Sequence, residues 1–180
     1  IVAEFVGLDG TAPSTPITTI DTETVDLTLL AEKQRALGKL QYLAVTRADI
    51  IVPLKFLASA PPNETNAQAT KRLFRYLRTP RALIYRGGGS RSNIVTIVSS
   101  SDADFSGFTN KRSLGGLQIC INQCAVVVKS ITQPLIAGSV SESELIAMCS
   151  AGQHQLYMRN IVEWIITKLR QSFPQLQLQL

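Results

Sequence analysis

Two pairs of carboxylates have the residue types and spacing to do chemistry. Asp102 and Asp104 follow an apolar, β-branched run that predicts a buried strand. Because side chains alternate faces along a strand, both acids should lie on one face, where a cation would relieve their repulsion. Glu142 and Glu144 begin a long helical pattern further along. Carboxylates at a strand end and a helix start could together hold a divalent metal through oxygen ligands.

The same acids also have purely structural explanations. Asp102 and Asp104 are of a residue type that forms turns at strand ends. Ser141 followed three residues later by Glu144 fits a capping box, in which Ser141 begins the helix and Glu144 bonds back to it. The residues alone leave both interpretations open.

Basic residues are concentrated in one segment. Residues 71–91 contain seven Lys and Arg and no acidic residue, whereas residues 1–70 contain five basic and eight acidic residues. Such a block indicates either a nearby polyanion or a solvated helix face. The candidate nucleic-acid contacts are the basic residues of this block and of the loop after the central strand: Lys71, Arg72, Arg75, Arg78, Lys111 and Arg112.

The overall composition indicates a folded protein. Of the 180 residues, 45% are hydrophobic and 17% are charged, which is enough apolar material for a core. No apolar run reaches the roughly 20 residues of a membrane span, so we expect no membrane partner. Three cysteines, an odd number, favour a reducing compartment and hence an intracellular location.

Hydrophobic periodicity predicts helices followed by a small sheet. An extended arm rich in Thr and Pro occupies residues 1–28. The expected elements are helices over 29–44 and 50–58, a helix capped by Asn63, a short strand over 82–85, a turn over 86–91, antiparallel strands over 94–103, 115–121 and 125–130, and a long helix from Ser141. The Gln and Leu alternation over 175–180 suggests another strand completing an open sheet edge.

Six short segments, in order and with compatible spacing, resemble the carboxy-terminal part of Ty1/copia-type retrotransposon polyproteins. In those proteins the end of the reverse transcriptase is followed by a ribonuclease H domain. The segments are 38–50, 71–77, 101–105, 111–116, 129–134 and 141–148.

The resemblance implies an α+β fold of RNase H-like type: a mixed sheet with an antiparallel three-strand meander and a long helix, truncated relative to the family. It divides the chain into an arm (1–28), a helical segment like the reverse-transcriptase thumb or connection (29–86) and the first part of an RNase H-like domain (92–180). It also implies that Asp102 and Glu144 are catalytic and hold Mg²⁺ or Mn²⁺, with Asp104 in support, to hydrolyse RNA in RNA–DNA hybrids.

The chain departs from that family in its acids. It has no Asp after Asp104 and only Glu163 after Glu144, so two of the four expected metal carboxylates are present. We therefore expect a catalytically incomplete module and leave open whether it is an enzyme. The alternative is a non-catalytic module of a domesticated retroelement. Its partners would be an RNA–DNA hybrid, another nucleic acid or a protein completing the sheet edge, in the cytoplasm within a virus-like particle or in the nucleus.

Overall fold

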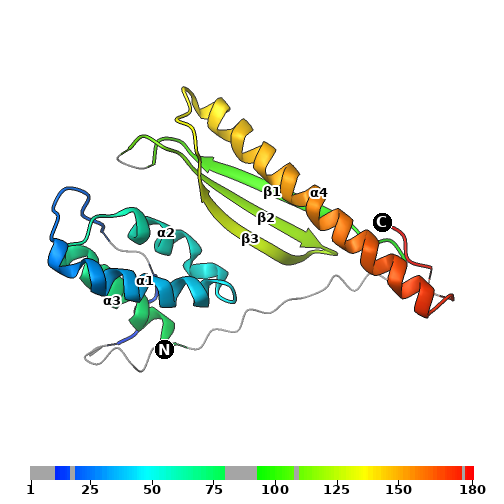
Figure 1. Ribbon diagram of the computed structural model, residues 1–180, viewed down its shortest axis with the longest axis horizontal. Helices are drawn as coiled ribbons and strands as arrows, with labels where there is room; N and C mark the ends of the chain where they lie inside the picture. The colour runs from blue at the N-terminus through cyan, green and yellow to red at the C-terminus, as the bar shows by residue number, and fades with distance from the viewer. Residues whose placement is uncertain (1–10, 17–18, 80–92, 108–109, 176) are drawn as a thin grey trace. The chain divides into compact units, whose positions relative to one another are not determined.

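The computed structural model describes residues 11–16, 19–79, 93–107, 110–175 and 177–180 (Figure 1). The chain forms two compact units, residues 1–83 and 84–180, and each is described here by itself. Its main elements are the helices α1 (Leu30–Ala44), α2 (Ile51–Ser59) and α3 (Glu64–Leu77), the strands β1 (Ile97–Asp104), β2 (Leu114–Ile121) and β3 (Cys124–Thr132), and the helix α4 (Val140–Ser172).

The predicted mixture of helices with a three-stranded antiparallel meander is confirmed. The strand expected over 82–85 and the turn over 86–91 lie outside the described residues. Within the described part of the chain, no helix is both long and apolar enough to cross a membrane.

The first unit is a packed group of three helices. Leu40, Ile50, Leu73 and Phe74 are fully buried at its centre. Asn63 begins α3 as expected, because its side chain accepts a hydrogen bond from the Asn66 N–H at 2.8 Å. The backbone N–H of Asp26, in the preceding arm, donates to the Pro62 carbonyl, which holds the arm against the start of α3.

An ion pair in the segment before α2 is linked to α3 through Tyr76. Arg47 donates two hydrogen bonds to the Asp49 carboxylate, at 2.9 and 2.8 Å, and the Tyr76 hydroxyl donates a third at 2.7 Å. The Arg47 guanidinium also lies over the Tyr76 ring. Tyr76 is only 3% exposed, so this cluster ties a buried residue of α3 to the turn that starts α2.

The second unit is a sheet with the order β1-β2-β3, covered on one face by α4 (Figure 1). Leu117 and Ile119 of β2 pack against Ala151 of α4 in its core. On β1, the Ser99 hydroxyl donates to Gln155 of α4 at 2.6 Å, which shows that the odd-numbered side chains of β1 face the helix.

The start of α4 differs from the sequence prediction. Ser139, not Ser141, is the N-cap, and its side chain accepts from the Glu142 N–H at 3.1 Å. Glu142 in turn accepts from the Gly138 N–H at 2.7 Å. The capping arrangement therefore lies two residues earlier than predicted, because Ser141 and Glu144 repeat the Ser139 and Glu142 spacing. Glu144 therefore takes no part in this cap.

Replacing Asp49 with Asn should destabilise the first unit in a pH-dependent way. The hydrogen bonds from Arg47 lower the pKa of Asp49 from 3.8 to about 2. A lowered pKa stabilises the fold above the unfolded value, and this stabilisation is lost as the pH falls from about 4 to about 2. We expect Asp49→Asn to cost about 1–2 kcal/mol at pH 7 and progressively less below pH 4 in urea unfolding. The exposed Glu23→Gln is the control; an equal cost at pH 2 and pH 7 would contradict this account.

Candidate functional site

The predicted metal carboxylates lie on different sides of the sheet. Asp102 and Asp104 share one face of β1, as predicted, and both are exposed. That face is the one opposite α4, since the odd-numbered side chains face the helix. The Asp104 carboxylate also lies so close to Gly107 that a side chain at this glycine would collide with it.

Glu144 reaches β1 from the helix side. Its carboxylate accepts a hydrogen bond from the Ala103 N–H at 3.3 Å, and its side chain is half-buried. Across the described ranges, no group of three or more His, Cys, Asp or Glu residues could hold a metal ion. The three carboxylates therefore do not form one ligand set in this structure, and their roles with Mg²⁺ or Mn²⁺ stay predictions.

The predicted basic contacts fall in both units. Lys71, Arg72 and Arg75 of α3 are half-buried, while Arg78 at the end of that helix is exposed. Arg72 donates to the Thr15 hydroxyl at 3.3 Å, so it also holds the arm. The side of α3 that carries these residues is thus partly covered, and it is not a fully solvated face.

The other two basic residues, Lys111 and Arg112, are exposed in the loop before β2. Lys111 adopts a positive φ of 62°, and the Arg112 N–H donates to the Asn110 side chain at 3.1 Å. These contacts define a tight turn that presents both charges to solvent. Nucleic-acid contact by any of these basic residues stays a prediction.

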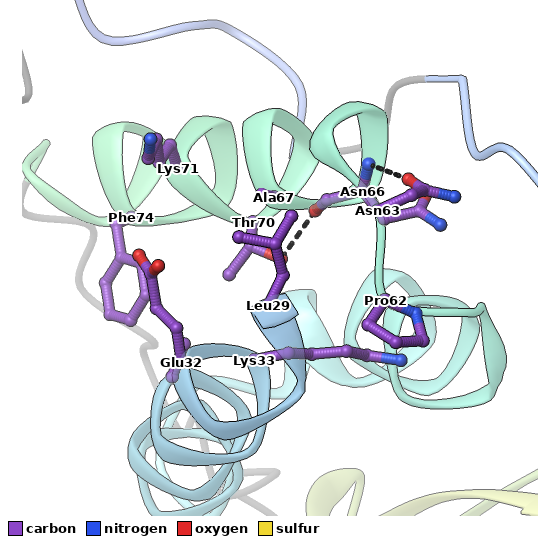
Figure 2. Close-up of a pocket in the computed structure, with 11 residues that line it drawn as sticks. Leu29, Glu32, Lys33, Pro62, Asn63, Asn66, Ala67, Thr70, Lys71 and Phe74 are labelled. Carbon is purple, nitrogen blue, oxygen red and sulfur yellow. Dashed lines mark hydrogen bonds between the residues drawn. The ribbon is translucent and has the colours of Figure 1, made fainter. Parts of the chain in front are cut away.

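A pocket of about 420 Å³, including the open space at its mouth, lies between α1 and the start of α3 (Figure 2). Its polar lining is occupied by the fold itself. The Asn66 side chain donates to the carbonyls of Asp21 and Pro61, Lys33 donates to the Ala60 carbonyl, and Thr70 donates to the Asn66 carbonyl. These polar groups hold the arm and the helix ends in place. We therefore interpret the pocket as a packing feature of the fold and not as a ligand site.

Sequence reasoning missed how β1 presents its backbone. The Asn122 N–H donates to the Thr96 carbonyl, so the even-numbered residues direct their backbone groups toward β2. The odd-numbered ones face outward: the Ala103 N–H meets Glu144, and the Ile97 carbonyl lies 3.5 Å from the Gln155 amide. No hydrophobic pattern encodes this choice, because it concerns backbone direction and not side chains.

The carboxy-terminal residues lie at the same outer edge. The Val95 N–H donates to the Gln179 carbonyl at 2.6 Å, and the Gln179 N–H donates to the Asn93 carbonyl at 2.7 Å. The resulting bridge between Ile94 and Gln179 is parallel. The chain thus places a parallel segment beside the start of β1, at the edge left open by the meander.

Comparison with known proteins gives one informative match. The chain is 32% identical over 127 residues to secreted RxLR effector protein 161 of Plasmopara viticola, covering 68% of this chain and 88% of that protein. The chain belongs to the family of this effector. The matched share is longer than either unit, so the similarity extends over parts of both. No family model matches the chain, and no solved structure matches it.

The match overturns the retrotransposon interpretation. The protein that the chain matches is an effector and not a Ty1/copia polyprotein, and no family model matches the chain. The predicted function, an RNase H module or its domesticated, non-catalytic alternative, is therefore wrong. The predicted intracellular location is wrong on the same ground, because the relative is named as a secreted protein.

The segments that carried the resemblance have structural roles in this fold. Arg47 and Asp49 form the ion pair with Tyr76. The buried Gln133 donates through its side-chain amide to the Ser143 carbonyl at 2.7 Å, joining the end of β3 to α4. Short segments with such roles do not require a shared activity.

Substitutions should show that Glu144 contributes to the stability of the second unit and that the exposed Asp102 does not. Glu144→Ala leaves the Ala103 N–H without its acceptor and should cost about 1 kcal/mol in urea unfolding of the second unit. Glu144→Gln keeps an acceptor oxygen and should cost less. The exposed Asp102→Asn is the control and should stay within about 0.5 kcal/mol of wild type. Equal costs for Glu144→Ala and Asp102→Asn would show that the hydrogen bond contributes nothing.

Proposed function

We propose that this chain is an effector-like protein that acts by binding another protein through its sheet-and-helix unit. The match to a secreted RxLR effector carries the proposal, because it spans 88% of that protein. For this chain, secretion is part of the same proposal. Nothing in the proposal calls on hydrolysis or on a bound metal.

Exposed apolar side chains on α4 support a role in protein binding. Leu145, Met148, Leu156, Tyr157 and Trp164 are each between 58% and 66% exposed. At 100° per residue, Leu145, Leu156 and Trp164 lie on the side of α4 opposite the buried Ala147, Ala151 and Val162, while Met148 and Tyr157 lie on the two flanks of that side. Clustered large apolar residues on a surface typically mark a contact site, and Trp and Tyr dominate the binding energy of protein interfaces.

The open face of the sheet adds a second exposed apolar surface. Val98, Val126 and Val128 are 58%, 45% and 38% exposed, and the even-numbered side chains of β1 point to the same face. The second unit therefore has exposed apolar side chains on the outside of its helix and, beside the acids Asp102 and Asp104, on the outside of its sheet. A protein partner would bury either surface with a favourable free energy.

We also propose that the second unit has the strand arrangement of an RNase H-like sheet. The support is the antiparallel meander, the long helix that follows it, and the parallel bridge of Gln179 beside the start of β1. This part of the proposal concerns the fold alone. A shared fold does not imply a shared activity, because function depends on the site it carries.

Substitutions on the outer face of α4 test the protein-binding role. The variant Met148→Ser, Leu156→Ser, Trp164→Ser removes three exposed apolar side chains. The control Gln153→Ala, Asn160→Ala, Lys168→Ala changes three exposed polar side chains of the same helix. Both should unfold within about 1 kcal/mol of wild type, because none of the six residues is buried.

The readout is quantitative affinity purification, followed by direct binding measurements with each purified candidate partner. We expect at least one partner to bind wild type and the control equally, and the apolar variant at least about tenfold more weakly. If every purified partner binds the folded apolar variant as tightly as wild type, or if no purified candidate binds directly, this proposal is wrong.

A further inference from the structure

The outer edge of β1 has backbone N–H and carbonyl groups that form no hydrogen bond with any residue that the structure describes. Ser99 and Ser101 direct their backbone N–H and carbonyl groups away from β2, by the alternation that Thr96 and Ala103 establish. Among the residues that the structure describes, neither serine's outward backbone groups have a partner. Unpaired groups in a row along a strand form a template for another strand.

Side chains of α4 limit this open stretch at both ends. Glu144 accepts from the Ala103 N–H, and the Gln155 amide approaches the Ile97 carbonyl. The tail residue Gln179 pairs further back, with Asn93 and Val95. The segment left open is therefore centred on Ser99 and Ser101.

The open stretch contains no charge, proline or bulge of the kind that usually blocks strand addition. Natural edge strands are protected by Lys, Pro, bulges or a covering segment. Residues 97–101 read Ile-Val-Ser-Ser-Ser, with no charge and no proline, and the register of β1 with β2 is unbroken. Only the acids Asp102 and Asp104 follow, and they project to the open face of the sheet.

A groove lies where this edge begins, on the amino-terminal side of the open stretch, and would take the end of an extended segment that continues along Ser99 and Ser101. It measures about 830 Å³, including open solvent, and lies among residues 94–98, the α4 residues Gln155, Arg159 and Glu163, and Leu180. Arg159 and Glu163 form an ion pair with a 2.9 Å contact, so this wall is polar without a strong net charge. Side chains of an added strand that point toward α4 would meet polar groups, whereas those on the other face would lie beside Val98.

We propose that the outer edge of β1 binds an extended segment of a partner protein as an added strand that runs parallel to β1. We take the direction from Gln179, which already pairs in parallel at the start of the same edge. The preferred segment alternates polar residues toward α4 with apolar residues toward the open face. This inference rests on the proposed function only for the statement that the partner is a protein.

A synthetic peptide tests the edge independently of any natural partner. The probe is the acetylated and amidated peptide Thr-Val-Thr-Val-Thr, titrated into the ¹⁵N-labelled full chain and followed by NMR. We expect saturable amide shifts confined to residues 97–103 and their β2 neighbours. A nitroxide on the peptide's amino end should broaden signals near Ile97, and one on its carboxyl end should broaden signals near Ala103.

Backbone changes on either molecule provide the controls. N-methylation of the alternate peptide amides that face the edge should abolish binding, whereas methylation of the other set should not. Ser101→Pro removes an outward N–H and should weaken binding at least about fivefold, while Ser101→Ala keeps the N–H and should leave it unchanged. If Ser101→Pro does not fold, Ser99→Pro makes the same test.

Shifts elsewhere, reversed spin-label broadening, equal effects of the two methylation patterns or no saturable shift would each overturn the inference. The two proposals can fail separately. Peptide binding at the edge without any directly binding partner protein would contradict the proposed function and leave the strand site standing. A partner protein whose binding depends on the outer face of α4, with no peptide binding at β1, would support the proposed function and overturn the strand site.

Discussion

One constraint shapes the second unit: in the part of it that the structure describes, a single helix covers one face of a three-stranded sheet. α4 packs on β1 and β2 and buries Leu117 and Ile119 against Ala151. It leaves the other face of the sheet, its own outer side and the outer edge of β1 exposed. Two-layer packing normally buries one stripe of a helix and one face of a sheet. Here both layers also have apolar residues on their outer sides, which is why we interpret the unit as a binding module.

The elements were largely predictable because their signals are local. Asn63 caps α3 through its own side chain, and the three strands follow turn residues and β-branched runs. The cap of α4 was predicted two residues late because Ser139 and Ser141 each precede a Glu by three positions. Only the backbone geometry distinguishes them: the Ser139 side chain accepts the Glu142 N–H.

The placement of the candidate carboxylates was predictable only in part. Alternation correctly placed Asp102 and Asp104 on one face. A second signal for the face went unused: the side of β1 that meets α4 carries Ile97, Ser99, Ser101 and Ala103 without a charge, so the side with the two acids is the one to expect in solvent. The outward backbone of Ser99 and Ser101 could not be predicted in this way, since hydrogen-bond direction depends on the partner strand's register. The short motifs led to a wrong functional prediction. Arg47, Asp49 and Gln133 stabilise this fold, and a short motif does not show whether its residues are kept for stability or for a shared activity.

The most direct measurement is amide hydrogen exchange along β1 in the free protein. If the outer edge is open, the Ser99 and Ser101 amides should exchange at least about a hundredfold faster than those of Ser100 and Asp102, which face β2. The alternation would appear within a single strand, so differences in global stability could not produce it. Equal protection of all four amides would mean that the edge is already paired, and the account of β1 as a strand-binding site would be wrong.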